Sequence, residues 1–218
     1  MQDLRVDLSD ESNPKGGARM KCDILLCGVG GQGTVLASKI LSQAAVDEGL
    51  FVRSAETIGM AQRGGAVVSH VRIGDSVYSP LIEPGHADVL LAFEPGEAAR
   101  NLRFLQPGGL LVVSDKGIMP VTASLGRSGY DPEVTLRFLR EKADPVILCA
   151  DSVFEEVGST KVLNVALIGA AGRAGALGFA RETLLGAMEK RIPERFMALN
   201  KRAFEAGEHL AIPSREGR

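Results

Sequence analysis

The chain has 218 residues, 45% of them hydrophobic, and carries a formal net charge of −2. A chain of this size and composition can bury one ordinary core, which favours one domain. The near-neutral charge, the 5% aromatic content and the absence of Trp argue against a nucleic-acid partner, because such partners need a basic surface with stacking side chains.

The three cysteines, Cys22, Cys27 and Cys149, include no pair with the two-residue gap typical of zinc or iron–sulfur sites. We therefore expect no metal on this chain and a plain buried role for Cys27, which sits in an apolar run. Unpaired thiols fit a reducing compartment. No apolar stretch is long enough to cross a bilayer, and no secretory signal is seen. These features predict a soluble, cytoplasmic protein without a membrane partner.

Residues 1–20 are polar and aperiodic, which predicts a flexible N-terminal tail. An apolar strand over Asp23 to Val29 follows and runs into a glycine-rich turn. A helix is expected over Thr34 to Glu48, with Gly49 as the residue that stops it. A second strand over Phe51 to Ala55 then completes a strand–helix–strand crossover.

The middle of the chain predicts further strands. Ala66 to Ile73 alternates like a strand, and Gly74-Asp75 then predicts a tight turn into a short antiparallel strand over 76–79, a β-hairpin excursion. Later elements are expected as follows: a strand over 88–93, a helix over 96–105, a turn at 107–109 and a strand over 110–113. Runs that are apolar on both faces indicate a parallel sheet covered by helices.

The C-terminal half is predominantly helical in pattern. Its expected elements are a loop over 117–131, a helix over 132–142, a strand over 146–149, a helix over 153–157 capped by Asp151 or Ser152, and helices over 162–177, 181–190 and 194–210. The predicted fold is therefore α/β: a Rossmann-like, mostly parallel sheet with helices on both faces, the hairpin excursion and a helical C-terminal segment.

The glycine turn of Gly28, Gly30 and Gly33 follows the order strand, turn, helix. This order offers backbone N–H groups and a positive helix end to a phosphate. It fits the dinucleotide fingerprint, with Glu56 placed to hold a ribose. It equally fits a phosphate or cofactor brought by another component, or a turn that only lets the helix pack on the sheet. The residues by themselves leave the three interpretations open.

Other chemistry-bearing residues have structural interpretations. His70 lies within a strand and is expected to be a satisfied structural histidine, while Asp115 follows a strand and is expected to cap a helix or turn. The sequence has no nucleophile elbow and no phosphate loop ending in Lys-Ser or Lys-Thr. This argues against hydrolases and nucleoside triphosphatases.

The segment 56–65 joins two strands without a helix and contains three glycines and one arginine. Glycines let the backbone approach a neighbour closely, Arg63 offers a planar fork of donors to a carboxylate or phosphate, and Met60 supplies a flexible apolar contact. The segment therefore predicts a loop that meets something outside the domain, with Arg63 as the candidate catalytic residue. A plain solvated loop is the alternative.

These two segments resemble the small subunit of the 2-oxoacid:ferredoxin oxidoreductases, specifically the indolepyruvate oxidoreductase beta subunit, and are similar to the gamma subunit of the pyruvate and 2-oxoglutarate enzymes. The resemblance covers about residues 21–190. It is carried by Gly28-Val29-Gly30-Gly31-Gln32-Gly33, Glu56-Thr57, Gly59-Met60-Ala61-Gln62-Arg63-Gly64-Gly65, Val68-Ser69-His70-Val71-Arg72, Ser79-Pro80-Leu81-Ile82, Ala87-Asp88, Glu94-Pro95, Glu97-Ala98 and Asn164 ahead of Gly169.

The resemblance implies that a 2-oxoacid and coenzyme A give an acyl-CoA, carbon dioxide and reduced ferredoxin. It implies thiamine diphosphate, Mg²⁺ and 4Fe–4S clusters on a large (alpha) subunit, with no cofactor bound by this chain alone and ferredoxin reached through the complex. The sequence agrees by lacking a Gly-Asp-Gly…Asn thiamine signature. The 2-oxoacid stays open among indolepyruvate or another aryl pyruvate, pyruvate and 2-oxoglutarate.

By the same resemblance, the residues expected to face the shared cofactor region are Gly28, Gly30, Gly31, Gln32, Gly33, Thr57, Gly59, Met60, Gln62, Arg63 and Gly64. Residues 21–190 are the expected gamma-type domain, and the charge-rich residues 191–218 an exposed or partner-facing C-terminal helix and tail. The isolated chain is expected to be inactive and able to self-associate. A stand-alone NAD- or FAD-binding protein and a pure assembly module are the competing hypotheses.

Overall fold

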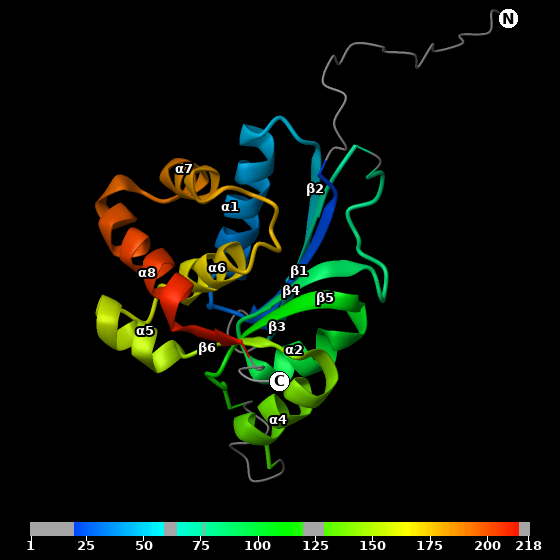
Figure 1. Ribbon diagram of the computed structural model, residues 1–218, viewed down its shortest axis with the longest axis vertical. Helices are drawn as coiled ribbons and strands as arrows, with labels where there is room; N and C mark the ends of the chain where they lie inside the picture. The colour runs from blue at the N-terminus through cyan, green and yellow to red at the C-terminus, as the bar shows by residue number, and fades with distance from the viewer. Residues whose placement is uncertain (1–19, 59–64, 76, 120–128, 214–218) are drawn as a thin grey trace, which may run out of the picture.

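The computed structural model describes residues 20–58, 65–75, 77–119 and 129–213, which form a seven-stranded sheet between two layers of helices (Figure 1). The strand order is β2-β3-β1-β4-β5-β6-β7. The strands are β1 Cys22–Val29, β2 Val52–Ile58, β3 Ala66–Ile73, β4 Ala87–Ala92, β5 Leu105–Ser114, β6 Val146–Leu148 and β7 Ala211–Pro213. Only β3 and β7 run against the other five, so the sheet is mixed but mostly parallel.

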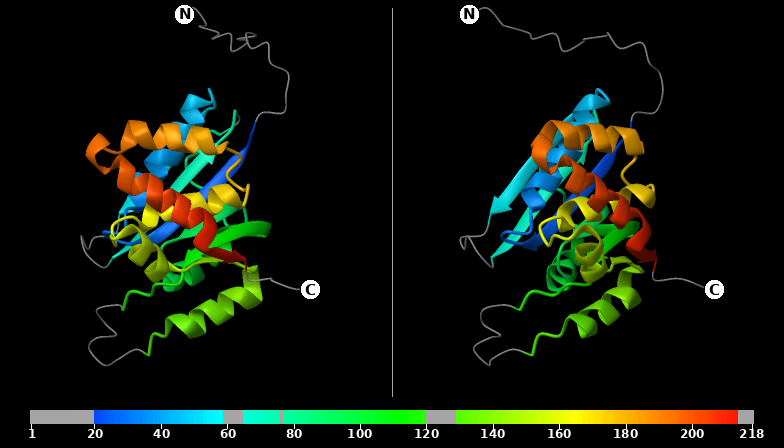
Figure 2. Two further views of the ribbon diagram at one scale, coloured as in Figure 1. Left: turned by 60° about the vertical axis from the view of Figure 1, so that its left-hand side comes forward. Right: turned by 90° about the vertical axis from the view of Figure 1, so that its left-hand side faces the viewer.

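Helices cover both faces of the sheet (Figures 1 and 2). One face carries α1 Thr34–Asp47, α5 Ala150–Val157, α6 Leu163–Arg173, α7 Arg181–Arg191 and α8 Met197–Leu210, and the other carries α2 Pro95–Asn101 and α4 Pro132–Ala143. Short 3₁₀ turns precede β5 and α8, at Leu102–Phe104 and Glu194–Phe196. Successive β1 side chains enter opposite cores, Ile24 with the α1 group and Leu25 with the α2 group. This alternation explains why the strand is apolar throughout.

The predicted strand–helix–strand unit is present, but its two strands are not neighbours. β3 lies between β1 and β2 and pairs antiparallel with both. For the same reason the return strand expected over 76–79 is wrong, since both edges of β3 are already occupied and residues 77–79 form no strand. The β-hairpin of the fold is β2–β3 instead. Residues 77–83 cross β3 without pairing to it, and Ile82 anchors them in the α2-side core.

The turn expected at 107–109 is also wrong, because β5 already begins at Leu105. The pairing of β4 with β5 shifts register between Ala87 and Val89, which marks a bulge. Gly109 fits there because an added Cβ would lie 3.0 Å from the carbonyl oxygen of Ala87. The glycines therefore lie within an irregular strand and do not form a separate turn before it. The helix expected over 96–105 stops at Asn101 and gives way to a 3₁₀ turn.

The C-terminal helices form where expected, with three corrections. α5 begins at Ala150, before the predicted caps Asp151 and Ser152, and α6 ends at Arg173. α8 is exposed on one face only, because its other face packs against α6 so closely that a Cβ on Gly207 would overlap that helix. β7 has no signal in the sequence and forms by pairing with β6.

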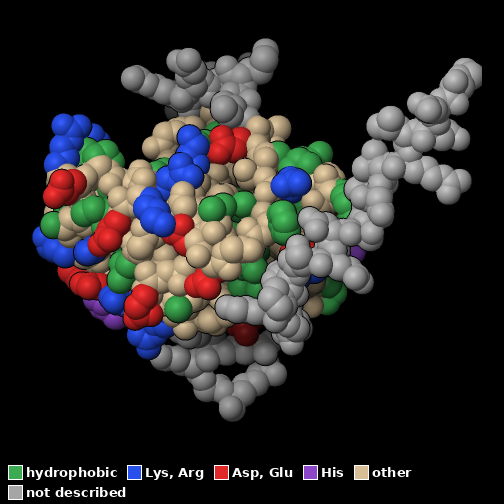
Figure 3. All heavy atoms as spheres, turned by 90° about the horizontal axis from the view of Figure 1, so that it is seen from above, with side chains coloured by type: hydrophobic (Ala, Val, Ile, Leu, Met, Phe, Trp, Pro, Cys, Tyr) green, Lys and Arg blue, Asp and Glu red, His purple; other side chains and the backbone are tan. Residues whose placement is uncertain are grey.

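The face seen from above carries interspersed basic and acidic side chains and no patch of one sign (Figure 3). Ion pairs between helices agree with this mixture: Lys190 with Asp47 and Lys201 with Glu189. Such exposed pairs contribute little to stability. Because basic and acidic side chains are mixed, this face lacks the electrostatic field of one sign that attracts a polyelectrolyte such as a nucleic acid.

Candidate functional site

The candidate site lies where β1 and β4 run parallel and side by side. The chain leaves β1 into α1 on one face and leaves β4 towards α2 on the other face. In an open α/β sheet such a point opens a crevice beyond the carboxyl ends of the strands, where ligands bind. The predicted glycine turn follows β1 and therefore stands at this crevice.

Three glycines of the turn are explained by close contacts or by backbone conformation. A Cβ on Gly28 would lie 2.8 Å from Cβ of Phe93, so the turn passes directly beside the end of β4. Gly31 and Gly33 have φ of +100° and +84°, which side-chain-bearing residues rarely adopt. The N–H of Gly30 donates to the carbonyl of Gly65 at 2.9 Å, which ties the turn to the chain just before β3.

Gln32 fastens the turn to the neighbouring strand. Its Oε1 accepts from the N–H of Val29 at 2.6 Å, and its Nε2 donates to the carbonyl of Phe93 at 2.9 Å. The side-chain amide is therefore engaged inside the protein. These two bonds hold the Gln32 side chain in one orientation at the turn.

Helix α1 begins at the turn without a side-chain cap. Its N-cap residue is Gly33 and its first turn contains no acidic residue. Among the residues that the structure describes, no side chain accepts from its first N–H groups. Uncapped N–H groups at a helix start favour an anion through hydrogen bonding and the helix dipole. Asn164 lies beside this start, with Nδ2 3.4 Å from the carbonyl oxygen of Gly33.

A groove of about 560 Å³ opens in front of the helix start. It is lined by Gly31, Gln32, Gly33, Leu36, Lys116, Ile118, Phe154, Thr160, Lys161, Leu163 and Asn164. Its walls come from α1, from the chain after β5 and from the α5–α6 region. Its volume lies within the range of small-molecule sites.

The other side of the crevice is acidic. Glu94 is 2% exposed and caps α2 by accepting from the N–H of Glu97 at 2.8 Å. Tyr130 donates its hydroxyl to the second oxygen of Glu94. Burial raises the pKa of Glu97, and burial together with the Glu94 carboxylate raises the pKa of Tyr130. An anion is therefore favoured on the α1 side of the glycine turn and disfavoured on the α2 side.

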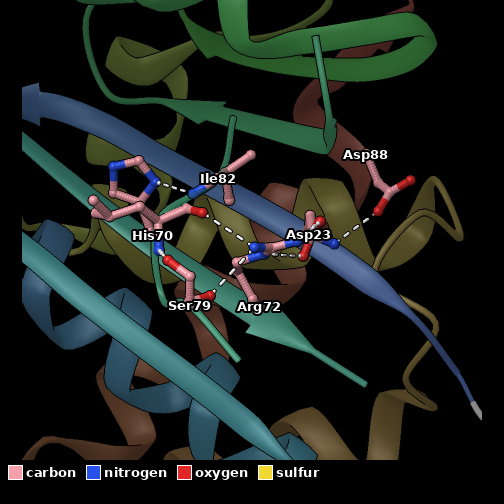
Figure 4. A network of polar contacts seen from close by, with 7 residues as sticks. Asp23, His70, Arg72, Ser79, Ile82 and Asp88 are labelled. Atoms are coloured by element: carbon pink, nitrogen blue, oxygen red, sulfur yellow. Dashed lines mark hydrogen bonds and ion pairs between the residues drawn. The ribbon is translucent and has the colours of Figure 1, made fainter. Parts of the chain in front are cut away.

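His70 and Asp115 have the structural roles expected of them. Nδ1 of His70 accepts from the N–H of Ile82 at 3.1 Å, so the ring is a buried, satisfied histidine (Figure 4). Asp115, the residue after β5, accepts from the N–H of Ala150 with Oδ1 at 2.8 Å and so caps α5. Burial raises the pKa of Asp115.

The predicted residues of the second motif are only partly described. Thr57 is exposed on the edge strand β2, opposite Val68 of β3. Glu56 accepts from Ser38 of α1 at 3.0 Å. The remaining predicted residues, Gly59, Met60, Gln62, Arg63 and Gly64, lie outside the described residues.

Lys116, Lys161 and Asn164 were not predicted as site residues. Asn164 was noted only within the family resemblance, and the two lysines had no signal beyond their charge. They reach the glycine turn from sequence positions more than eighty residues away. Identifying these three residues requires knowledge of the strand order and of how α6 packs, and neither can be read from the sequence.

Within the described ranges, no group of three or more His, Cys, Asp or Glu side chains is placed to hold a metal ion. No helix among these residues is long and apolar enough to cross a membrane. Cys22 and Cys27 are buried, and burial raises the pKa of Cys22 to about 12 and that of Cys27 well above its ordinary value. Thiols held protonated in this way are poor metal ligands.

A family model matches the sequence over most of the chain. Residues 23–209 match the model described as pyruvate ferredoxin/flavodoxin oxidoreductase. The chain is 38% identical over 201 residues to the indolepyruvate oxidoreductase subunit IorB of Archaeoglobus fulgidus, covering 90% of this chain and 98% of that protein. It is 27% identical to the pyruvate/ketoisovalerate oxidoreductases common subunit gamma of Thermococcus kodakarensis, covering 85% and 93%.

Solved structures share the fold. The keto/oxoacid ferredoxin oxidoreductase gamma subunit from Geobacter sulfurreducens superposes with a TM-score of 0.66 at 24% identity, covering 88% of this chain and 97% of that one. The 2-oxoglutarate:ferredoxin oxidoreductase from Magnetococcus marinus gives a TM-score of 0.67 at 20% identity, and there the match covers 88% of this chain but 31% of that one. The α/β fold expected from the sequence is thereby confirmed.

Proposed function

Since this chain belongs to the pyruvate ferredoxin/flavodoxin oxidoreductase family, we propose that it is the small subunit of an indolepyruvate:ferredoxin oxidoreductase. The observation that carries the proposal is the 38% identity to an IorB subunit along 98% of that subunit's length. Identity to a pyruvate-type gamma subunit is 27% and to a 2-oxoglutarate synthase subunit KorC 28%, which favours the indolepyruvate branch.

In the proposed reaction an aryl pyruvate and coenzyme A give an acyl-CoA, carbon dioxide and reduced ferredoxin. We assign thiamine diphosphate, Mg²⁺ and the 4Fe–4S clusters to the large (alpha) subunit, because this sequence lacks both the Gly-Asp-Gly…Asn thiamine signature and a set of cluster-binding cysteines. A 4Fe–4S cluster takes four thiolates, whereas this sequence has three cysteines, two of them buried with raised pKa values. The chain would work in the cytoplasm and meet ferredoxin through the complex.

The proposed role of this chain is to present a rigid, anion-accepting edge to the alpha subunit. The glycine turn suits this role because its backbone is fixed by Gln32 and by the Gly30–Gly65 hydrogen bond, while α1 begins there without a cap. The predicted contacts of the 56–65 segment, Arg63 above all, remain part of this proposal.

A stand-alone dinucleotide-binding enzyme is the second hypothesis, and the topology argues against it. That function needs the acid after the second strand to lie beside the glycine turn. Here β3 separates β2 from β1, which puts the Glu56 strand about 10 Å from β1 at ordinary strand spacing. The Glu56 carboxylate also accepts from Ser38.

The test is reconstitution with the alpha subunit of the proposed enzyme. We expect the two chains to co-elute in gel filtration through an obligate interface on the order of 2,000 Å² or more. The complex should reduce viologen with indolepyruvate and coenzyme A, faster than with pyruvate or 2-oxoglutarate, and the isolated chain should be inactive. Activity of the isolated chain, or separate elution of the pair, would contradict the proposal.

The role of Arg63 needs a separate variant in the complex. Arg63→Ala should lower kcat while the subunits still co-elute, because a guanidinium fork that meets a substrate or cofactor carboxylate or phosphate is lost. Arg53→Ala is the matched control, since Arg53 is exposed on β2. Unchanged turnover in Arg63→Ala would leave this chain as a pure assembly module.

A further inference from the structure

Strand β2 forms an open edge of the sheet. It is the first strand in the order β2-β3-β1-β4-β5-β6-β7, and within the described residues no strand pairs with its outer side. In an antiparallel pair every second residue directs its N–H and C=O away from its neighbour, so part of the β2 backbone faces outward. Proteins commonly cover such an edge, because a free strand invites pairing with another chain. The edge of β2 can therefore accept one more strand.

Helix α1 provides an exposed apolar side chain beside this edge. Ser38 of α1 donates to Glu56 of β2 at 3.0 Å, which identifies the side of the helix that lies along β2. Ser42 and Val46 follow on the same side at intervals of four residues. Because α1 returns the chain from the end of β1 to the start of the parallel strand β2, it runs against β2. Val46 therefore lies towards the start of β2, and its side chain is 55% exposed.

The opposite face of β2 carries a positive charge without an acidic partner. Arg53 is exposed and faces Arg72 of β3 in register. Arg72 is neutralised by Asp23. Among the described residues no carboxylate pairs with Arg53, whose Nη1 lies 3.4 Å from the carbonyl oxygen of Val52. An added strand is therefore favoured if it places apolar residues on the α1 face and an acidic residue opposite Arg53.

The sequence ahead of β1 contains a segment with this pattern. The first twenty residues have no period as a whole, but Leu4, Val6 and Leu8 alternate with polar residues over 3–9. Strict alternation over such a length is typical of a strand with one buried face. The polar positions between them include Asp7. The segment thus offers both features that the edge of β2 favours.

One antiparallel register suits both faces of β2. With Leu8 opposite Val52, the apolar residues of the segment lie on the α1 face. The same register puts Asp7 opposite Arg53 on the other face, where the two charges attract. A shift by two residues in one direction puts Arg5 opposite Arg53, and a shift by two in the other direction moves Asp7 away from Arg53. A shift by one residue turns the apolar side chains away from α1.

The chain is long enough to bring this segment to β2. Cys22 of β1 pairs with Ile73 of β3, which pairs with Val52 of β2, so β1 and β2 start at the same end of the sheet. A strand outside β2 would lie three strand spacings from β1, or about 14 Å. Residues 10–19 can span about 33 Å when extended. A segment that joins them at this end runs against β2, as the register requires.

We propose that residues 3–9 pair antiparallel with β2 and add a strand to the edge of the sheet. The apolar residues of this strand pack beside Val46 of α1, and Asp7 pairs with Arg53. The expectation of a flexible tail then applies to residues 10–19 alone. The added strand covers the edge through which two copies of the chain could otherwise pair. The inference goes beyond the proposed oxidoreductase function and does not depend on it.

Disulfide trapping in the full-length chain tests the register. In Asp7→Cys/Arg53→Cys the two cysteines would face each other with Cα atoms about 4.5–5.5 Å apart, which suits a disulfide. In the control, Val6→Cys/Arg53→Cys, the thiols would point to opposite faces of the sheet. Under mild oxidation we expect the first pair to form an intrachain disulfide at least about tenfold faster than the control. Peptide mapping distinguishes this bond from the three native cysteines.

Hydrogen exchange measures the pairing without new cysteines. Val6→Asp/Leu8→Asp places two carboxylates on the apolar face of the segment and should release it from β2. We expect the outward-facing amides of β2 to exchange at least about tenfold faster in this variant than in the parent chain. Ser9→Asp/Ser12→Asp is the matched control, because it adds the same charge to the tail at polar positions. It should leave the exchange of β2 unchanged.

The inference is overturned if the two cysteine pairs react at equal rates, or if Val6→Asp/Leu8→Asp leaves the exchange of β2 unchanged. An interchain disulfide would assign the edge to the tail of a second copy and would also overturn it. So would protection of β2 that appears only when the alpha subunit is bound, because that subunit would then cover the edge. Turnover enters none of these measurements, so a failure of the proposed function leaves the added strand unaffected.

Discussion

The guanidinium of Arg72 holds the carboxylate of Asp23 through two parallel hydrogen bonds, Nε to Oδ1 at 2.9 Å and Nη2 to Oδ2 at 3.0 Å (Figure 4). The two residues face each other in register across β3 and β1, and Asp23 is 1% exposed. Nη1 of Arg72 donates to the carbonyls of Ser79 and Leu81. One arginine therefore neutralises a buried acid and holds the segment that crosses β3.

Replacing Arg72 should be strongly destabilising. Arg72→Ala would leave the Asp23 carboxylate buried without its partner and is expected to lower the free energy of unfolding by about 3–5 kcal/mol, measured by urea denaturation. Arg72→Lys should have a free energy of unfolding between those of the parent chain and Arg72→Ala, because lysine keeps the charge but cannot form the two parallel hydrogen bonds. Arg53→Ala is the control: Arg53 faces Arg72 in register from β2 but is exposed. Equal losses of unfolding free energy in Arg53→Ala and Arg72→Ala would show that the Arg72–Asp23 ion pair does not account for the loss.

The stability of the chain should depend on pH through His70. Burial, with the nearby charge of Arg72, lowers the pKa of His70 below its ordinary value of 6.5, so the folded chain accepts this proton less readily than the unfolded chain. Stability is therefore complete above the unfolded pKa and is lost as the pH falls through 6.5 towards the folded pKa. Urea midpoints between about pH 7.5 and about pH 5.5 measure the loss.

His70→Asn separates this effect from the titration of other groups. The amide oxygen of asparagine can take the place of Nδ1 as acceptor for the N–H of Ile82, but it does not titrate. The variant should therefore lose less stability than the parent chain over the same pH range. A pH dependence identical to that of the parent would mean that His70 does not couple to folding.

Sequence patterns predicted those parts of the fold that local chemistry decides. The strand ending at Val29, the helix starting at Thr34 and the helix starting at Pro132 all form as expected. The errors occur where a distant strand decides. Residues 77–79 could not pair with β3 because β1 and β2 already occupy both of its edges. Gly109 lies within β5, where its register with β4 shifts, and not in a turn before that strand.

In the candidate site, too, local sequence predicts some features, while distant packing decides the others. The glycine turn was visible in the sequence, because only a strand end before a helix needs glycines at that spacing. The groove was not visible, because Lys116 and Asn164 reach the turn through the packing of β5 and α6. The cap of α5 shows the same limit: Asp151 is the cap that the sequence predicts, yet Asp115, which follows β5, makes the hydrogen bond.

The turn should tolerate side chains unequally at Gly31 and Gly33. Both have positive φ, so alanine at either should cost about 1–2 kcal/mol of backbone strain. At Gly31 an added Cβ meets nothing within 4 Å, whereas at Gly33 it would lie 2.8 Å from Nδ2 of Asn164. Gly33→Ala should therefore cost about 1–3 kcal/mol more than Gly31→Ala in urea denaturation.

A double variant tests whether Asn164 is the cause. When Asn164→Ala is already present, the contact with the new Cβ is gone, and Gly33→Ala should cost no more than Gly31→Ala does. Such a coupling between neighbouring residues is what a double-mutant cycle measures. If Gly33→Ala keeps its extra cost in that background, the strain lies in the backbone and the packing argument fails.

Tyr130 should matter to stability through a single oxygen atom. Its hydroxyl donates to the buried carboxylate of Glu94 and accepts from the N–H of Gly96 at 3.2 Å. Tyr130→Phe leaves the ring in place, removes both hydrogen bonds and is expected to cost about 1.5–3 kcal/mol, because one of them serves a charged group. Tyr78→Phe is the matched control, since Tyr78 is 91% exposed and its hydroxyl can bond to water. That control should change stability by less than about 0.5 kcal/mol. Equal effects of the two variants would mean that the Glu94 carboxylate finds another donor once Tyr130 loses its hydroxyl.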